Sequence, residues 1–300
     1  MSAVLTWIDP ELAGPDLVLL GVLTLVPIVV AIRTGPRQYR RILEQLAGRP
    51  NGLVRLMRRG AVVTWLLTFA ALAIVGGAPG LTLTHVGLAG LDAAGAALTV
   101  LAVLGFAGVQ LGGAFQAARR RAAGGRVRGE ALQRQVALLY PRTARERAWA
   151  AVLSVSVGVG EEVFFRGLLI AAAVGVGLPV WAAIVLPAVL FGLQHRYQTW
   201  RGVVFSTVFG LLMTLLYAAT ERLWTPIAVH AAWDLMALLV VPRVLAAHEA
   251  TASDGLRPRP AVLDPTAAAA PVPADPPVLS AAETLASPAG LPRLRSAAPE

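Results

Sequence analysis

Long apolar runs separated by short polar segments fill the first 247 residues of the chain. Several runs reach about 17–25 residues with little or no charge, the length that a helix needs to cross the hydrocarbon core of a bilayer. We therefore predict an all-α fold, a polytopic transmembrane bundle of about seven spans. The spans are expected near residues 17–32, 61–78, 93–116, 148–176, 179–195, 202–219 and 224–245.

The composition supports this membrane prediction. Of 300 residues, 56% are apolar and only 14% are charged, whereas about a quarter of a soluble domain is charged. The 26 basic residues are all arginine and give a net charge of +9, but they lie in short segments between spans, where membrane orientation explains them. Nucleic acid is therefore not expected as a partner. The chain has no cysteine, which excludes disulfides, thiolate nucleophiles and cysteine-ligated zinc.

The arginines also predict how the chain crosses the membrane. Segments 33–59 and 119–147 are rich in arginine, and they alternate with segments that have little or none. Because basic loops stay in the cytoplasm, we expect a multi-pass protein of the cell membrane. Its N-terminus would lie outside and its C-terminus in the cytoplasm.

Three regions follow from these patterns. Residues 1–147 form an N-terminal transmembrane region with three spans and basic cytoplasmic loops, which include an expected amphipathic surface helix at 130–140. Residues 148–247 form a transmembrane core of four spans that carries the candidate catalytic residues. Residues 248–300 are dominated by Ala, Pro, Ser and Thr and are predicted to be a disordered tail, because they cannot bury enough apolar surface to offset their ordering entropy.

Ionisable side chains inside apolar spans are costly, so each one marks a functional site by default. The first group is Glu161, Glu162 and Arg166. Glu162 and Arg166 are four residues apart and share a helical face, so they can pair. Glu161 is rotated by about 100° and has no local partner, which suits a general base. The alternative is an ion pair that only holds helices together.

The other candidate residues within the spans are two histidines and an aspartate. His195 follows Phe191 by one helical turn at the end of a span, where an interfacial role is the alternative to catalysis. His230 and Asp234 are also four residues apart, so the carboxylate can orient the imidazole; a hydrogen-bonded pair between helices is the alternative.

A glutamate and two histidines on adjacent helices can activate a water molecule in two ways. Glu161 can act directly as the base, or Glu161, His195 and His230 can hold a zinc ion with an open coordination position. The residues alone leave both possibilities open.

The order of these motifs resembles the CPBP family of intramembrane proteases, which includes CAAX prenyl endopeptidases and proteins linked to bacteriocin processing. The family pattern EExxxR, FxxxH and HxxxN or HxxxD stands here as Glu161-Glu162…Arg166, Phe191…His195 and His230…Asp234. The resemblance covers about residues 145–245. It implies an all-helical membrane fold with a cytoplasm-accessible chamber, and hydrolysis of a peptide bond in a membrane-associated or prenylated peptide substrate.

The resemblance also implies a role for each residue. Glu161 would activate water with His195 as its partner, while His230 and Asp234 would polarise the scissile carbonyl or hold the oxyanion. Glu162, Arg166 and Phe191 would support the chamber. Members of the family are described both as metalloproteases and as glutamate-dependent proteases, so zinc stays open as a cofactor.

Asp234 stands at a position where the family also has asparagine. An ionised aspartate cannot donate a hydrogen bond to an oxyanion, whereas asparagine can. If aspartate serves here, it would orient His230, coordinate a metal, or act in its protonated form. This difference favours the version with metal.

Depth in the membrane raises a difficulty for this site. Glu161 is expected about 20 Å from the cytoplasmic end of its span, and His195 roughly 10 Å or more nearer the surface. Either the span boundaries differ by a few residues, or the fourth span is broken or tilted after Arg166.

Two other functions compete with the protease. One is a non-catalytic scaffold or immunity-type protein of the same fold, which binds a partner without cleaving it. The other is a proton-coupled transporter, because acids and histidines within spans also form proton relays. The sequence shows no paired repeats with matching broken helices, which speaks against a transporter.

Overall fold

The computed structural model describes residue 12 and residues 14–46, 51–88, 90–123 and 139–247. Its elements, in chain order, are α1 (Gly14–Leu46), α2 (Gly52–Gly77), α3 (Ala93–Ala122), α5 (Ala144–Glu162), η1 (Val163–Leu168), α6 (Leu169–Gly175), α7 (Val180–Gln194), η2 (His195–Gln198), α8 (Thr199–Thr220), α9 (Trp224–Leu235) and η3 (Met236–Val240). The predicted all-α class is confirmed. The predicted tail at 248–300 lies outside the described residues, as does the predicted surface helix at 130–140 except for its last two residues.

Five described segments are long and apolar enough to cross a membrane, whereas the sequence predicted about seven spans. They are Gly14–Gly35, Gly52–Gly77, Ala93–Ala122, Val180–Thr220 and Trp224–Ala247. The fourth of these contains both α7 and α8, which were predicted as separate spans. The predicted span 148–176 is not among them, because α5 carries charged residues at both of its ends.

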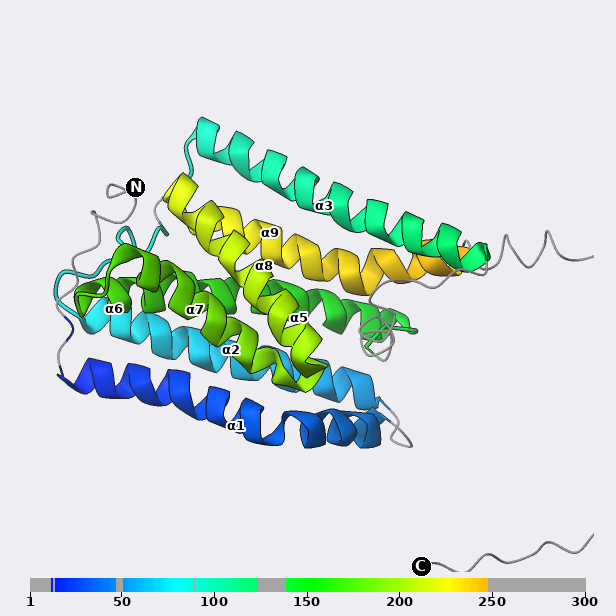
Figure 1. Ribbon diagram of the computed structural model, residues 1–300, viewed down its shortest axis with the longest axis horizontal. Helices are drawn as coiled ribbons and strands as arrows, with labels where there is room; N and C mark the ends of the chain where they lie inside the picture. The colour runs from blue at the N-terminus through cyan, green and yellow to red at the C-terminus, as the bar shows by residue number, and fades with distance from the viewer. Residues whose placement is uncertain (1–11, 13, 47–50, 89, 124–138, 248–300) are drawn as a thin grey trace, which may run out of the picture. The chain divides into compact units, whose positions relative to one another are not determined.

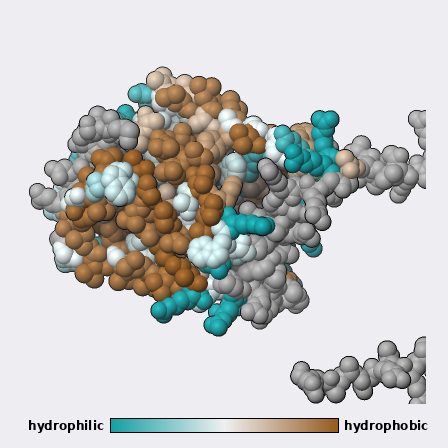
Figure 2. All heavy atoms as spheres, in the orientation of Figure 1, coloured by the Kyte–Doolittle hydropathy of each residue, from teal (hydrophilic) through white to brown (hydrophobic). Residues whose placement is uncertain are grey.

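The outer surface of the bundle is apolar, as a membrane protein requires. Large apolar side chains stay exposed along α3, for example Leu101 at 65% and Val109 at 71%. Figure 2 shows apolar residues covering most of the visible face of the helices, with polar residues gathered toward one end. Soluble monomers rarely expose so much contiguous apolar surface. The chain is therefore a multi-pass membrane protein, and the direction in which its termini face stays a prediction.

The first residues of α5 fix where the central helix of the site begins. The Thr143 hydroxyl accepts a hydrogen bond from the Glu146 backbone N–H at 3.2 Å, and the Glu146 carboxylate accepts one from the Thr143 backbone N–H at 2.9 Å. This reciprocal capping box satisfies two backbone donors that a helix start otherwise leaves free. As a result, α5 begins at Ala144, four residues before the predicted boundary.

Two glycines allow α5 to lie close between α2 and α9 (Figure 1). A Cβ added at Gly158 would lie 2.7 Å from the backbone nitrogen of Ala231 in α9. A Cβ added at Gly160 would overlap the hydroxyl oxygen of Thr68 in α2. Small residues at helix contacts in membranes let backbones approach closely, and here they bring the residues of α5 and α9 into direct contact.

We expect Gly158→Ala to push α9 away from α5 and to destabilise the fold by about 1–3 kcal/mol, as overpacking of a tight contact does. Thermal unfolding of the purified protein in detergent measures this effect. The control is Gly113→Ala in α3, where an added Cβ meets no atom within 4 Å and where alanine is the better helix former. Equal melting temperatures for Gly158→Ala and the parent would contradict the close packing of α5 on α9.

An antiparallel pair of helices, α7 and α8, forms another wall of the site. A Cβ at Gly192 would lie 2.8 Å from the carbonyl oxygen of Val203, and a Cβ at Gly210 would lie 3.4 Å from the Cα atom of Ala188. Residues near the end of α7 therefore face residues near the start of α8. The turn η2 between the two helices begins at His195, which places this histidine where the pair reverses direction.

Candidate active site

A fully buried ion pair lies at the centre of the bundle. Glu162 and Arg166 both have 0% exposed side chains, and Nη1 of Arg166 donates to Oε1 of Glu162 at 2.9 Å. Nη2 of Arg166 donates to the carbonyl oxygen of Gly210 in α8 at 2.8 Å. The Phe191 ring lies beneath the guanidinium, with its centroid 4.8 Å from Cζ, a cation–π arrangement. The predicted pairing of Glu162 with Arg166 is present, and it links α5, η1 and α8.

His230 joins this ion pair through Glu162. Its Nδ1 atom donates to Oε1 of Glu162 at 2.6 Å. The sequence instead pointed to Asp234 as the residue that orients His230, but the Oδ2 atom of Asp234 lies 3.9 Å from Nε2 of His230. The difference arises because α5 and α9 pack closely, so a carboxylate from the neighbouring helix approaches the imidazole more nearly than one on its own helix. No spacing in the sequence signals this contact.

Glu161 faces the other nitrogen of His230. Its Oε2 atom lies 3.8 Å from Nε2 of His230. That oxygen is buried and has no hydrogen-bond partner among the residues that the structure describes. The side chain as a whole is 22% exposed, toward a cavity. A carboxylate in this position has a free lone pair to offer to a ligand.

His195 is held by a hydrogen bond to its own helix. Its Nδ1 atom lies 2.9 Å from the carbonyl oxygen of Phe191. Because a carbonyl oxygen only accepts, Nδ1 must carry the proton, and Nε2 of the neutral ring is left as an acceptor. The Phe191 ring packs against both histidines, with centroid distances of 4.8 Å to His195 and 5.9 Å to His230.

One cavity of about 270 Å³ brings together the four predicted catalytic residues, Glu161, His195, His230 and Asp234. The expected difference in depth therefore does not separate His195 from Glu161. The helix geometry changes to a π-helix over Val163–Leu168, directly after Glu162. This segment contains Arg166, after which the sequence allowed a break or tilt of the fourth span. Such π-helical turns occur frequently at functional sites.

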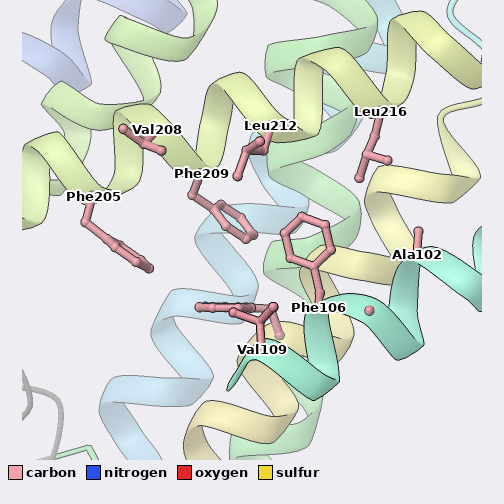
Figure 3. A pocket seen from close by; sticks show the side chains of 10 residues that line it. Ala102, Phe106, Val109, Phe205, Val208, Phe209, Leu212 and Leu216 are labelled. Carbon is pink, nitrogen blue, oxygen red and sulfur yellow. The ribbon is translucent and has the colours of Figure 1, made fainter. Parts of the chain in front are cut away.

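A second pocket, of about 540 Å³, lies between α3 and α8 and has an entirely apolar lining. Figure 3 shows side chains of the two helices pointing toward one another across it. Three aromatic residues, Phe205, Phe209 and Trp233, line both this pocket and the cavity that contains Glu161. Its ten lining residues are Ala102, Gly105, Phe106, Val109, Phe205, Val208, Phe209, Leu212, Leu216 and Trp233.

The predicted zinc ligands do not form a metal site in this arrangement. Within the described part of the chain, no group of three or more His, Cys, Asp or Glu residues is placed to hold a metal ion. Glu161, His195 and His230 line one cavity, but they are not gathered around one point as tetrahedral zinc ligands are. Zinc as a cofactor therefore stays a prediction, and we assign no chemical step to a metal.

These features define an all-helical, multi-pass membrane protein with a buried ion-pair network and ionisable residues around an intramembrane cavity. Residues 143–236, which include all seven site residues, match the family described as Type II CAAX prenyl endopeptidase Rce1-like. This match confirms the predicted resemblance of this segment to the CPBP family of intramembrane proteases. No curated protein and no solved structure matches the chain.

Proposed function

We propose that the chain is an intramembrane endopeptidase in which Glu161 activates the water that cleaves the peptide bond. The proposal is carried by one observation: the buried Oε2 atom of Glu161 has no partner among the described residues and faces His230 across 3.8 Å. A general base needs a lone pair within reach of the proton that it removes. The neighbouring cavity, of about 270 Å³, offers room for water and for part of a peptide.

The mechanism uses the two histidines differently. Nε2 of His195 accepts a hydrogen bond from the attacking water and positions it, while Glu161 removes the other proton as the water oxygen bonds to the carbonyl carbon. His230, protonated on both nitrogens, donates through Nδ1 to Glu162 and through Nε2 to the developing oxyanion. Glu161 then returns its proton to the leaving nitrogen as the C–N bond breaks, which yields a carboxylic acid and an amine.

The apolar pocket supports a substrate with a hydrocarbon group. Its volume of about 540 Å³ is within the range of small-ligand pockets. A helical substrate, about 10–12 Å across, would be too wide for this pocket. Because three aromatic residues line both spaces, a ligand in this pocket would lie beside the proposed catalytic cavity. The name of the matching family suggests a prenyl chain as the hydrocarbon.

The experiment that tests this function compares two peptides of identical sequence, a prenylated CAAX peptide and its unprenylated form, with the purified protein in liposomes. We expect cleavage of the prenylated peptide, detected by mass spectrometry. Gly105→Leu adds a side chain inside the apolar pocket and should raise KM by about tenfold for the prenylated peptide alone, since each buried methylene contributes about 0.8 kcal/mol.

Gly113→Leu is the matched control, because Gly113 is on the same helix and does not line the pocket. It should leave KM unchanged for both peptides. If the parent protein cleaves neither peptide, the proposed function is wrong. If Gly105→Leu affects both peptides equally, the assignment of the pocket to the prenyl chain is wrong.

A further inference from the structure

Ser154 is a buried hydroxyl that the mechanism above does not use. Its side chain is only 1% exposed, and its Oγ atom has no hydrogen-bond partner in the described part of the chain. It lines the same cavity as Glu161 and the two histidines. A buried hydroxyl without a partner destabilises the folded state, so its position in the cavity wall points to a ligand.

Ser156, two residues further along α5, is a serine with a structural role and serves as a comparison for Ser154. Its Oγ atom donates to the carbonyl oxygen of Val152 at 2.7 Å and accepts from Nε1 of Trp65 in α2 at 3.1 Å. Serines in helices commonly make this bond to the carbonyl four residues earlier. Ser154 makes no such bond, although it is equally buried, which sets it apart from Ser156.

The position of Ser154 relative to Glu161 defines which part of a substrate it can reach. The two residues are seven positions apart on α5, which is two helical turns, so both side chains lie on one face. The rise between them is about 10 Å, and an extended peptide covers about 3.3 Å per residue. If the peptide bond is cleaved beside Glu161, the substrate residue about three positions from that bond would therefore lie beside Ser154.

The surroundings of Ser154 define the chemistry of that contact. Leu139, Leu153 and Leu238 line the same cavity and pack together around Ala150, one turn before Ser154 on α5, so this part of the wall is apolar and is unsuited to an ionised group. An uncharged backbone amide fits this environment, because a serine hydroxyl both donates and accepts. Burial of a backbone amide among apolar side chains is costly unless it is hydrogen-bonded, and Ser154 supplies the partner.

We propose that Ser154 is a substrate-binding residue that hydrogen-bonds the peptide backbone about three residues from the cleaved bond. This inference rests on the proposed protease function, because it places an extended peptide between α5 and the opposite wall of the cavity. It adds a contact that determines the register of the peptide and lies outside the set of groups that perform the chemistry.

The test compares Ser154→Ala with Ser156→Ala in the cleavage of the prenylated CAAX peptide. Ser154→Ala should raise KM about fivefold, the loss of one net hydrogen bond, with unchanged kcat and an equal or higher melting temperature. Ser156→Ala should lower the melting temperature, because Trp65 loses its acceptor, and should leave KM unchanged. If KM of Ser154→Ala equals that of the parent, the inference is wrong.

A second measurement locates the contact on the substrate. Each backbone amide of the peptide is replaced in turn by an ester, which removes one N–H and weakens one carbonyl acceptor. The parent should lose affinity for the peptide altered about three residues from the cleaved bond, and Ser154→Ala should no longer distinguish that peptide from the others. The same discrimination in both proteins would overturn the inference, whereas a parent that cleaves no peptide overturns the proposed function together with it.

Discussion

Glu161→Gln is expected to lower peptide cleavage by about 10²- to 10⁴-fold, the contribution of a positioned general base. Glutamine has nearly the same shape as glutamate but cannot accept a proton from water at its amide. Because Oε2 of Glu161 makes no hydrogen bond to any described residue, the change removes no contact that the fold needs. Expression, membrane insertion and thermal stability should therefore match the parent.

The measurement is the initial rate of cleavage of the prenylated CAAX peptide in liposomes at several substrate concentrations. His195→Ala should also lose most of its activity, since it removes the acceptor that positions the water. Glu221→Gln is the matched control, because Glu221 is exposed and lies outside the cavity. Activity of Glu161→Gln equal to that of the parent would remove the basis of the mechanism.

The same assay tests the metal question. With water activated by Glu161 alone, the parent should keep its full rate after treatment with a chelator and transfer into metal-free buffer. Loss of activity that returns on addition of zinc would show that the cavity residues rearrange around a metal during catalysis.

The second large effect is expected at the buried ion pair. Arg166→Ala should destabilise the protein by about 3–5 kcal/mol, because it removes the arginine from a fully buried ion pair and leaves the Glu162 carboxylate with His230 as its one remaining partner among the described residues. Glu162→Ala should do the same to Arg166 and should also release His230 from the hydrogen bond that orients it. Both single variants should therefore unfold more easily, as measured by denaturant titration followed by tryptophan fluorescence.

The double variant Glu162→Leu with Arg166→Met separates stability from orientation. Replacing both partners of a buried ion pair by apolar residues of similar size is often neutral or stabilising, so this variant should recover most of the lost stability. It should remain inactive, because Nδ1 of His230 still lacks its acceptor. A double variant that is stable and also active would show that Glu162 has no part in orienting His230.

Local spacing allowed the contacts within one helix to be predicted from the sequence. Glu162 and Arg166 pair as their separation of four residues suggested, and apolar runs located most of the helices. The start of α5 was placed four residues late, although Thr143 and Glu146 have the spacing of a capping box that marks its true first turn.

Contacts between helices were not predictable in this way. The hydrogen bond from His230 to Glu162 joins residues 68 positions apart, and the bond from Arg166 reaches a backbone carbonyl, at Gly210, which carries no mark in the sequence. Gly158 and Gly160 make the close helix contacts possible, but glycine is too frequent in this chain, at 29 residues, for such positions to stand out. The seven candidate site residues were chosen by residue type and order, while their partners depend on packing.

The wall formed by Phe205, Phe209 and Trp233 has a consequence for inhibitor chemistry. Because these rings line both the apolar pocket and the cavity that holds Glu161, the two spaces are adjacent, and the second also contains ionisable side chains. An amphiphilic compound could fill both, with a hydrated amide isostere beside Glu161 and an aliphatic tail between α3 and α8. The tail would gain binding energy from desolvation, and the head group would confer selectivity over ordinary bilayer lipids.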